Sequence, residues 1–240
     1  MAKKKIQQDS FIEMRKRIQK TPITKAKPVE VTALRKYFLI VCEGEKTEPA
    51  YFEYIQRMLP KHLLTTIDIR GEGDNTINIV KKAVALRDAR KKTDHPYDEV
   101  WAVYDKDDFP ASRYNEAVKY SMQHDIQSAH SNQSFELWYI LHFKNLQSAW
   151  HRSRCIEALS KEILKTPYAK NDPHIPAYMF KHGKVKRAIK WAKALDEKYK
   201  GPKYTPATSC PHTMVYALVE KLLKYCNPEL ISPAQSNPTP

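Results

Sequence analysis

The fold is decided by one stretch near the start of the chain, Phe38-Leu39-Ile40-Val41-Cys42-Glu43-Gly44-Glu45-Lys46-Thr47-Glu48-Pro49. Its first five residues are continuously apolar, which is typical of a strand that helices cover on both faces. The apolar run ends at a carboxylate and a glycine. The proline that follows is suited to the first turn of a helix, where its missing N–H costs nothing. The pattern predicts a strand over residues 37–42 and a helix over 49–58, with Glu45 and Glu48 assigned to the helix start.

A second apolar run with an acidic end follows later, at Val100-Trp101-Ala102-Val103-Tyr104-Asp105-Lys106-Asp107-Asp108. Further strands are predicted at residues 65–70 and 126–130, and helices at 76–91, 111–124 and 134–143. Strands that alternate with helices of this length are joined by right-handed crossovers into a parallel sheet. We therefore predict an α/β fold with a Rossmann-like parallel sheet flanked by helices.

The strand pattern fades after Trp150, and residues 151–165, 182–200 and 211–226 have helical patterns, joined by a proline-rich loop. We expect these helices to pack on the α/β core as a helical C-terminal extension. The predicted organisation is a basic flexible arm (1–35), a catalytic α/β domain (36–145), a helical C-terminal part (146–228) and a disordered tail (229–240). The arm either grips phosphates or acts as a solubilising leader, with a short helix near residues 11–18.

The charge balance is strongly positive, because 41 Lys and Arg residues against 27 Asp and Glu residues leave a net charge of +14. Such an excess favours a polyanionic partner, since contacts with phosphates release counterions and give affinity for any sequence. The alternatives are a basic protein without such a partner, or one that binds an acidic protein. About 42% of the residues are hydrophobic, which is enough for a sizeable core.

The four cysteines stand at positions 42, 155, 210 and 226, without a Cys-x-x-Cys pair. This spacing argues against a zinc site or a disulfide framework and fits a reducing compartment. No apolar run approaches the roughly 20 residues that span a bilayer, and the basic N-terminus lacks the apolar stretch of a signal peptide. We expect a soluble cytoplasmic protein without a membrane partner; the oligomeric state is left open.

The acidic residues at the strand ends predict a metal site. Carboxyl ends of parallel strands meet at one edge of the sheet, so Glu43 and Asp105 are expected to lie together there. Asp107 stands two residues after Asp105, which directs both side chains to the same side of an extended chain. Hard oxygen ligands of this kind suit Mg²⁺ or Mn²⁺, and two such ions about 4 Å apart can support phosphodiester cleavage. The alternative for residues 105–108 is a solvated turn.

Other side chains have two interpretations each. Asp108 and Glu136 either join the metal site, or act as a turn residue and a helix-end carboxylate. Lys46 either holds a phosphate at a helix start or is solvated, and Gly71 and Gly73 either admit a phosphate or form a tight turn. A basic helical segment is predicted as a nucleic-acid track, against an ordinary solvated face; its basic residues are Lys184, Lys186, Arg187 and Lys190.

Four motifs occur together: Cys42-Glu43-Gly44-Glu45-Lys46-Thr47-Glu48-Pro49 with Tyr51-Phe52, Asp105-x-Asp107-Asp108, Ser131-Asn132, and Phe135-Glu136-Leu137-Trp138. Over residues 36–145, and weakly at 215–219, the chain resembles RloB-type proteins. These are bacterial proteins with a Toprim-like domain, related to the Abi phage-defence proteins. The resemblance implies a Toprim-like fold in which Glu43, Asp105 and Asp107 bind metal and act on phosphodiesters, with Glu43 as a ligand or as the general acid–base.

The resemblance also implies a role in abortive infection beside an ATPase, which must be a separate protein because this chain lacks a P-loop motif. The predicted function is therefore a nuclease that uses Mg²⁺ or Mn²⁺ to cleave DNA or RNA, including tRNA. One alternative is a regulatory module that binds metal and nucleic acid without turnover. Another is a basic scaffold protein in which the acidic residues only form turns.

Overall fold

A computed structural model describes residues 36–59, 66–71 and 76–226 of the 240-residue chain. The predicted basic arm, the C-terminal tail and Gly73 lie outside the described residues. All the elements described below belong to one compact unit.

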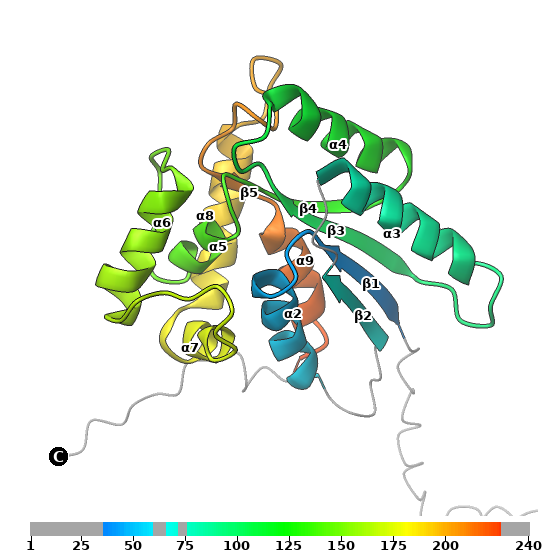
Figure 1. The fold of residues 1–240 in the computed structure, drawn as a ribbon, viewed down its shortest axis with the longest axis horizontal. Coiled ribbons are helices and arrows are strands. Elements are labelled where there is room, and N and C mark those ends of the chain that lie inside the picture. Colours follow the sequence, from blue (N-terminus) through cyan, green and yellow to red (C-terminus); the bar gives the residue numbers. More distant parts are fainter. Residues whose placement is uncertain (1–35, 60–65, 72–75, 227–240) are drawn as a thin grey trace, which may run out of the picture. The chain divides into compact units, whose positions relative to one another are not determined.

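The centre of this unit is a mostly parallel sheet with the strand order β2-β1-β3-β4-β5 (Figure 1). The first four strands in chain order are β1 (Tyr37–Cys42), β2 (Thr66–Gly71), β3 (Glu99–Asp105) and β4 (Gln127–Asn132). They pair in parallel, and β5 (His212–Thr213) pairs with β4 in the antiparallel direction. The predicted α/β fold with a parallel sheet is confirmed. β5 was not predicted, because a two-residue strand is too short to show an alternating pattern.

The helices of the α/β part connect these strands: α2 (Thr47–Arg57), α3 (Thr76–Arg90), α4 (Ala111–Gln123) and α5 (Glu136–Leu141). The C-terminal part adds α6 (Arg152–Ala158), a π-helical stretch (Leu159–Leu164), α7 (Ile175–His182), α8 (Val185–Lys198) and α9 (Val215–Leu223). Helix α7 occupies sequence that we assigned to a proline-rich loop. Its Pro176 stands in the first turn, the one part of a helix that tolerates proline without loss.

Both faces of the sheet are covered, which explains why β1 is apolar without interruption. Phe38 and Ile40 point to one face and pack in a core with α2, α5 and α9, whereas Leu39 and Val41 point to the other face and pack with α3 and α4. Figure 1 shows α3 and α4 together on one side of the sheet and α2 and α9 on the other. With this arrangement, the edge at the carboxyl ends of the strands remains for a functional site.

Aromatic side chains fix α5 against α2 beside that edge. Tyr51 of α2 makes ring contacts with Phe135, Trp138 and Tyr139, with centroid distances of 5.7, 6.4 and 5.7 Å. The Tyr51 hydroxyl lies 3.1 Å from Nε2 of His142, and all of these side chains are buried.

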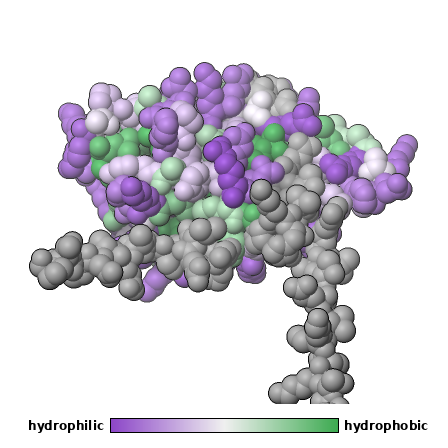
Figure 2. Space-filling view, turned by 90° about the horizontal axis from the view of Figure 1, so that it is seen from below, coloured by the Kyte–Doolittle hydropathy of each residue, from purple (hydrophilic) through white to green (hydrophobic). Residues whose placement is uncertain are grey.

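The surface is largely hydrophilic on the face in Figure 2, where hydrophobic areas are small and separated by hydrophilic ones. Among the described residues, the large hydrophobic side chain left exposed is Met122, at 74%. Within the same part of the chain, no helix is both long enough and apolar enough to cross a membrane.

Candidate functional site

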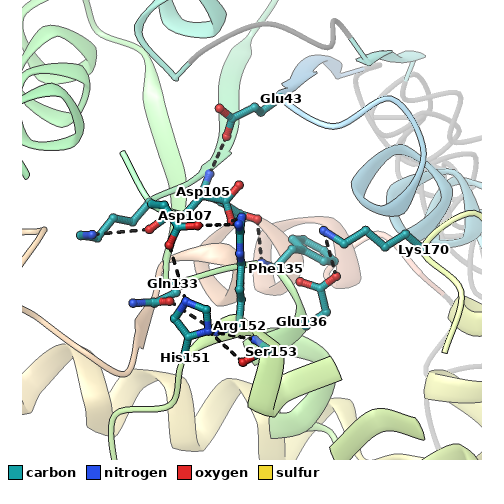
Figure 3. A network of polar contacts seen from close by, with 12 residues as sticks. Glu43, Asp105, Asp107, Gln133, Phe135, Glu136, His151, Arg152, Ser153 and Lys170 are labelled. Atoms are coloured by element: carbon teal, nitrogen blue, oxygen red, sulfur yellow. Dashed lines mark hydrogen bonds and ion pairs between the residues drawn. The ribbon is translucent and has the colours of Figure 1, made fainter. Parts of the chain in front are cut away.

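Glu43 and Asp105 meet at the carboxyl edge of the sheet because β1 and β3 are neighbours. Oε2 of Glu43 accepts a hydrogen bond from the backbone N–H of Asp105 at 2.9 Å, and its Oε1 accepts one from the Thr76 hydroxyl at 3.3 Å. The backbone N–H of Glu43 extends the sheet by donating to the carbonyl of Val103 at 2.8 Å. The Glu43 carboxylate therefore lies across the end of β3, as shown in Figure 3.

Asp105 is held from the other side by the start of the α5 segment. Its Oδ2 accepts a hydrogen bond from the backbone N–H of Phe135 at 2.9 Å, while its Oδ1 is buried without a partner. Asp107 follows in a left-handed backbone conformation with φ of 44°, and its N–H donates to the carbonyl of Gln133 at 2.9 Å. The turn after β3 thus presents both aspartates on the same edge.

Glu48 also belongs to this cluster, although its sequence position suggested only a helix start. It stands in the first turn of α2, is 6% exposed and lines the same cavity as Glu43. Gly44 makes this placement possible, since a Cβ at residue 44 would overlap Oε2 of Glu48. Gly71 has a similar packing role, because a Cβ there would lie 2.8 Å from the Cα of Glu45. This contact supports the structural interpretation of Gly71 over a phosphate contact.

Glu136 approaches the cluster from α5. It is 1% exposed, and its Oε1 accepts a hydrogen bond from the Tyr168 hydroxyl at 3.1 Å. The same oxygen lies 3.5 Å from Nζ of Lys170, whereas Oε2 is buried without a partner. A helix-end carboxylate would be expected to face solvent, so this burial gives Glu136 a place in the cluster.

These side chains enclose a cavity of about 280 Å³. Six acidic and two basic residues line it, namely Glu43, Glu45, Glu48, Asp105, Asp107 and Glu136 with Lys46 and Lys170. The acids come from the α/β part. Lys170 comes from the loop before α7, in the C-terminal part, and reaches Glu136 in Figure 3.

The crowding of carboxylates raises their pKa values. Burial, with the charges of Asp107 and Glu48, raises the pKa of Glu43 to about 7, against the hydrogen bonds from Asp105 and Thr76. Burial and then the charge of Glu136 raise the pKa of Glu48 to about 7. The pKa of Asp105 is raised well above its ordinary value, by burial first and then by the charges of Glu48 and Glu136. Burial and neighbouring like charges both disfavour an ionised carboxyl group. The positive charge of a bound cation would offset both of these penalties.

Other predicted residues lie elsewhere. The Asp108 side chain is 61% exposed, contacts Arg152 and His151, and is outside the cavity lining. The basic residues at the start of α8 also lie outside that lining and are exposed; they are Lys184, Lys186, Arg187 and Lys190. Nδ2 of Asn132 donates to the carbonyls of Pro206 and Ala207 at 3.2 and 2.9 Å, so this side chain holds the chain before β5 rather than facing the cavity.

The donor set fits a hard divalent cation in its chemistry. All candidate ligands are carboxylate oxygens, and the buried Oδ1 of Asp105 and Oε2 of Glu136 have no hydrogen-bond partner. Within the described ranges, however, no three His, Cys, Asp or Glu side chains already have an arrangement that would hold a metal ion. The Mg²⁺ or Mn²⁺ site stays a prediction.

The fold and the site together define an α/β protein with an acidic cavity at the carboxyl edge of a mostly parallel sheet. A family model described as RloB-like protein matches residues 38–222, and the chain belongs to that family. The match spans both the α/β part and most of the C-terminal helices, well beyond the motifs at residues 36–145. Comparisons with curated proteins and with solved structures gave no significant match.

Proposed function

We propose that this protein is a metal-dependent nuclease that cleaves phosphodiester bonds in DNA or RNA. The observation that carries the proposal is the convergence of Glu43, Asp105 and Asp107 with two further buried carboxylates around one cavity. Buried carboxylate oxygens without a partner, such as Oδ1 of Asp105 and Oε2 of Glu136, are costly to fold unless a ligand compensates them. The chain has a net charge of +14, so it does not need these acidic residues to stay soluble. A bound cation is the better explanation for the cluster.

Glu43, Asp105 and Asp107 would hold Mg²⁺ or Mn²⁺, with Glu48 and Glu136 as the adjoining carboxylates. When bound, such an ion supplies Lewis-acid stabilisation of the phosphate and lowers the pKa of a coordinated water. The protein contributes position: the Phe135 N–H orients Asp105, and the Asp105 N–H orients Glu43. Fixed ligands of this kind reduce the reorganisation that catalysis requires.

The positive residues supply the contact with nucleic acid in this proposal. Lys46 lines the mouth of the cavity and is exposed, which suits contact with a phosphate near the acids. The exposed basic residues at the start of α8 would extend that contact along the backbone of the substrate. A role in phage defence beside a separate ATPase rests on the resemblance between the motifs and RloB-type proteins.

The test is a cleavage assay with the full chain. Plasmid DNA, single-stranded DNA and tRNA are incubated with Mg²⁺ or Mn²⁺, with and without EDTA. We expect metal-dependent cleavage of at least one substrate, and a loss of about 100-fold or more in Glu43→Gln and Asp105→Asn, since a metal ligand contributes several kcal/mol. Asp94→Asn is the matched control, because Asp94 is exposed in the loop before β3, at the opposite edge of the sheet.

Two outcomes would contradict the proposal. Metal-dependent binding without cleavage, also with an ATPase partner and ATP present, would favour a non-catalytic regulatory module. Cleavage that survives in both Glu43→Gln and Asp105→Asn would show that the acidic cavity is not the active site.

A further inference from the structure

Arg152 is bound to the loop that carries Asp107 in two ways. Its Nη1 lies 3.0 Å from Oδ1 of Asp107, and its Nη2 contacts Oδ2 of Asp108. Its backbone N–H donates to the side-chain Oε1 of Gln133 at 3.3 Å. The carbonyl of Gln133 in turn accepts the N–H of Asp107. Arg152 is the first residue of α6, so a residue of the C-terminal part sits directly against one of the proposed metal ligands, as Figure 3 shows.

The contact places a positive charge where the proposed metal ion must act. One guanidinium nitrogen, Nη1, forms an ion pair with Asp107, which lines the cavity, while Nη2 contacts Asp108, which lies outside it. The Arg152 side chain is 37% exposed and therefore has solvent on one side into which it can turn. Guanidinium nitrogens bind carboxylate and phosphate oxygens alike, so a phosphate oxygen can replace Oδ1 of Asp107 as the partner of Nη1.

We propose, on the basis of the nuclease function above, that Arg152 is an exchangeable counter-ion of Asp107. In the metal-free protein Arg152 neutralises Asp107. In the metal-loaded protein Arg152 gives up Asp107, keeps Asp108 as its anchor and binds a phosphate of the nucleic-acid substrate. Arg152 is thus a positioning residue for Asp107 in one state and a substrate-binding residue in the other.

The exchange makes two predictions of opposite sign for Arg152→Gln. Removing a unit positive charge about 6 Å from a divalent ion changes the affinity by about tenfold in a water-like medium, so Mn²⁺ should bind about tenfold more tightly. The same variant should bind a nucleic acid more weakly in the presence of metal, because a phosphate contact is lost. A residue that only stabilises the loop would instead weaken both interactions.

The experiment uses the full chain. Mn²⁺ affinity is measured by electron paramagnetic resonance at constant ionic strength. Affinity for single-stranded DNA is measured by fluorescence anisotropy with Ca²⁺, which is used to limit turnover. Arg152→Gln is compared with Arg152→Lys, which keeps the charge and should retain Mn²⁺ affinity close to that of the wild type. The control is Arg154→Gln, because Arg154 is similarly exposed and pairs with Glu157 and Glu162 rather than with the cavity.

Tighter Mn²⁺ binding with weaker DNA binding in Arg152→Gln, and neither change in Arg154→Gln, would support the exchange. Unchanged or weaker Mn²⁺ binding in Arg152→Gln, with a wild type that binds Mn²⁺, would overturn the exchange and leave the nuclease proposal standing. A wild type that does not bind Mn²⁺ would overturn both. Thermal melting of each variant shows whether a lost signal comes from unfolding, and the charge-retaining Arg152→Lys keeps the test decisive if Arg152→Gln is unstable.

Discussion

Two glycines border the loop after β1, and alanine at each should have a different effect. A Cβ at Gly44 would overlap the carboxylate of Glu48 and lie 2.9 Å from its Cδ, so the new methyl group meets the end of one flexible side chain. A Cβ at Gly71 would lie 2.8 Å from the Cα of Glu45 and 2.9 Å from the carbonyl oxygen of Gly44, which are backbone atoms. We predict that Gly44→Ala displaces Glu48 and preserves the fold, whereas Gly71→Ala forces the backbone to shift.

The expected free energies of unfolding follow from these contacts. In Gly44→Ala, moving one side chain to another rotamer costs about 0.5–1.5 kcal/mol, and the reduced freedom of the unfolded chain returns about 0.4–1 kcal/mol. The net change should stay within about 1 kcal/mol. In Gly71→Ala, steric overlap with the backbone should cost about 1–3 kcal/mol, as in overpacked cores.

Guanidinium unfolding of both variants in EDTA, with Mn²⁺ titration of each, measures the two effects. Gly44→Ala should lose Mn²⁺ affinity because Glu48 leaves the cavity, although its stability is nearly unchanged. A loss of stability in Gly44→Ala equal to or larger than that in Gly71→Ala would refute the reasoning. It would mean that the Glu48 side chain is held too firmly to move.

Three further predictions concern the acidic cluster and the core. Glu48→Gln should be more stable than the wild type in metal-free buffer at pH 8 and not at pH 4.5. Burial raises the pKa of Glu48 to about 7, so at pH 8 the ionised carboxylate destabilises the folded wild type, whereas glutamine stays neutral; unfolding curves at the two pH values test this. Asp105→Asn should lose the rise in melting temperature that Mn²⁺ gives the wild type, whereas Asp94→Asn should retain it. Burial lowers the pKa of His142 to about 3, so the contribution of His142 to the free energy of unfolding should be complete above the unfolded pKa near 6.5 and fall by about 1.4 kcal/mol per pH unit below it. The difference in stability between the wild type and His142→Asn should therefore change with that slope between pH 6 and 4, as measured by unfolding curves.

The α/β core and the convergence of Glu43 with Asp105 were predictable because both depend on local patterns. The apolar run of β1 indicates a strand covered on both faces, and parallel topology then places the strand ends at one edge. No tertiary detail is needed for that step.

The burial of Glu48 was not predictable in the same way, since acidic residues in a first helical turn usually face solvent. The available signal was Gly44, which leaves space for the carboxylate. Nothing in the sequence indicated that Arg152 and Lys170 would contact the acidic residues. Their contacts with Asp108 and Glu136 join residues 44 and 34 positions apart, across loops whose paths depend on packing of the C-terminal helices.

Arg152 and Lys170 both bring positive charge from the C-terminal part to the acidic residues of the α/β part. The acids of the cavity belong to the α/β part, whereas Arg152 and Lys170, which contact Asp107 and Glu136, belong to the C-terminal part. A phosphate that approached the cavity without a cation would meet six carboxylates and only two lysines in its lining, so Coulomb repulsion would oppose binding there. The net charge of +14 attracts a polyanion to the protein as a whole, but it does not remove this local barrier. Under the proposed function, a nucleic acid could therefore bind at this edge only with further positive charge at the acids, from a bound metal ion or from Arg152. The C-terminal part places Arg152 at Asp107 and Lys170 at Glu136, and the family match across residues 38–222 covers both these residues and the acids.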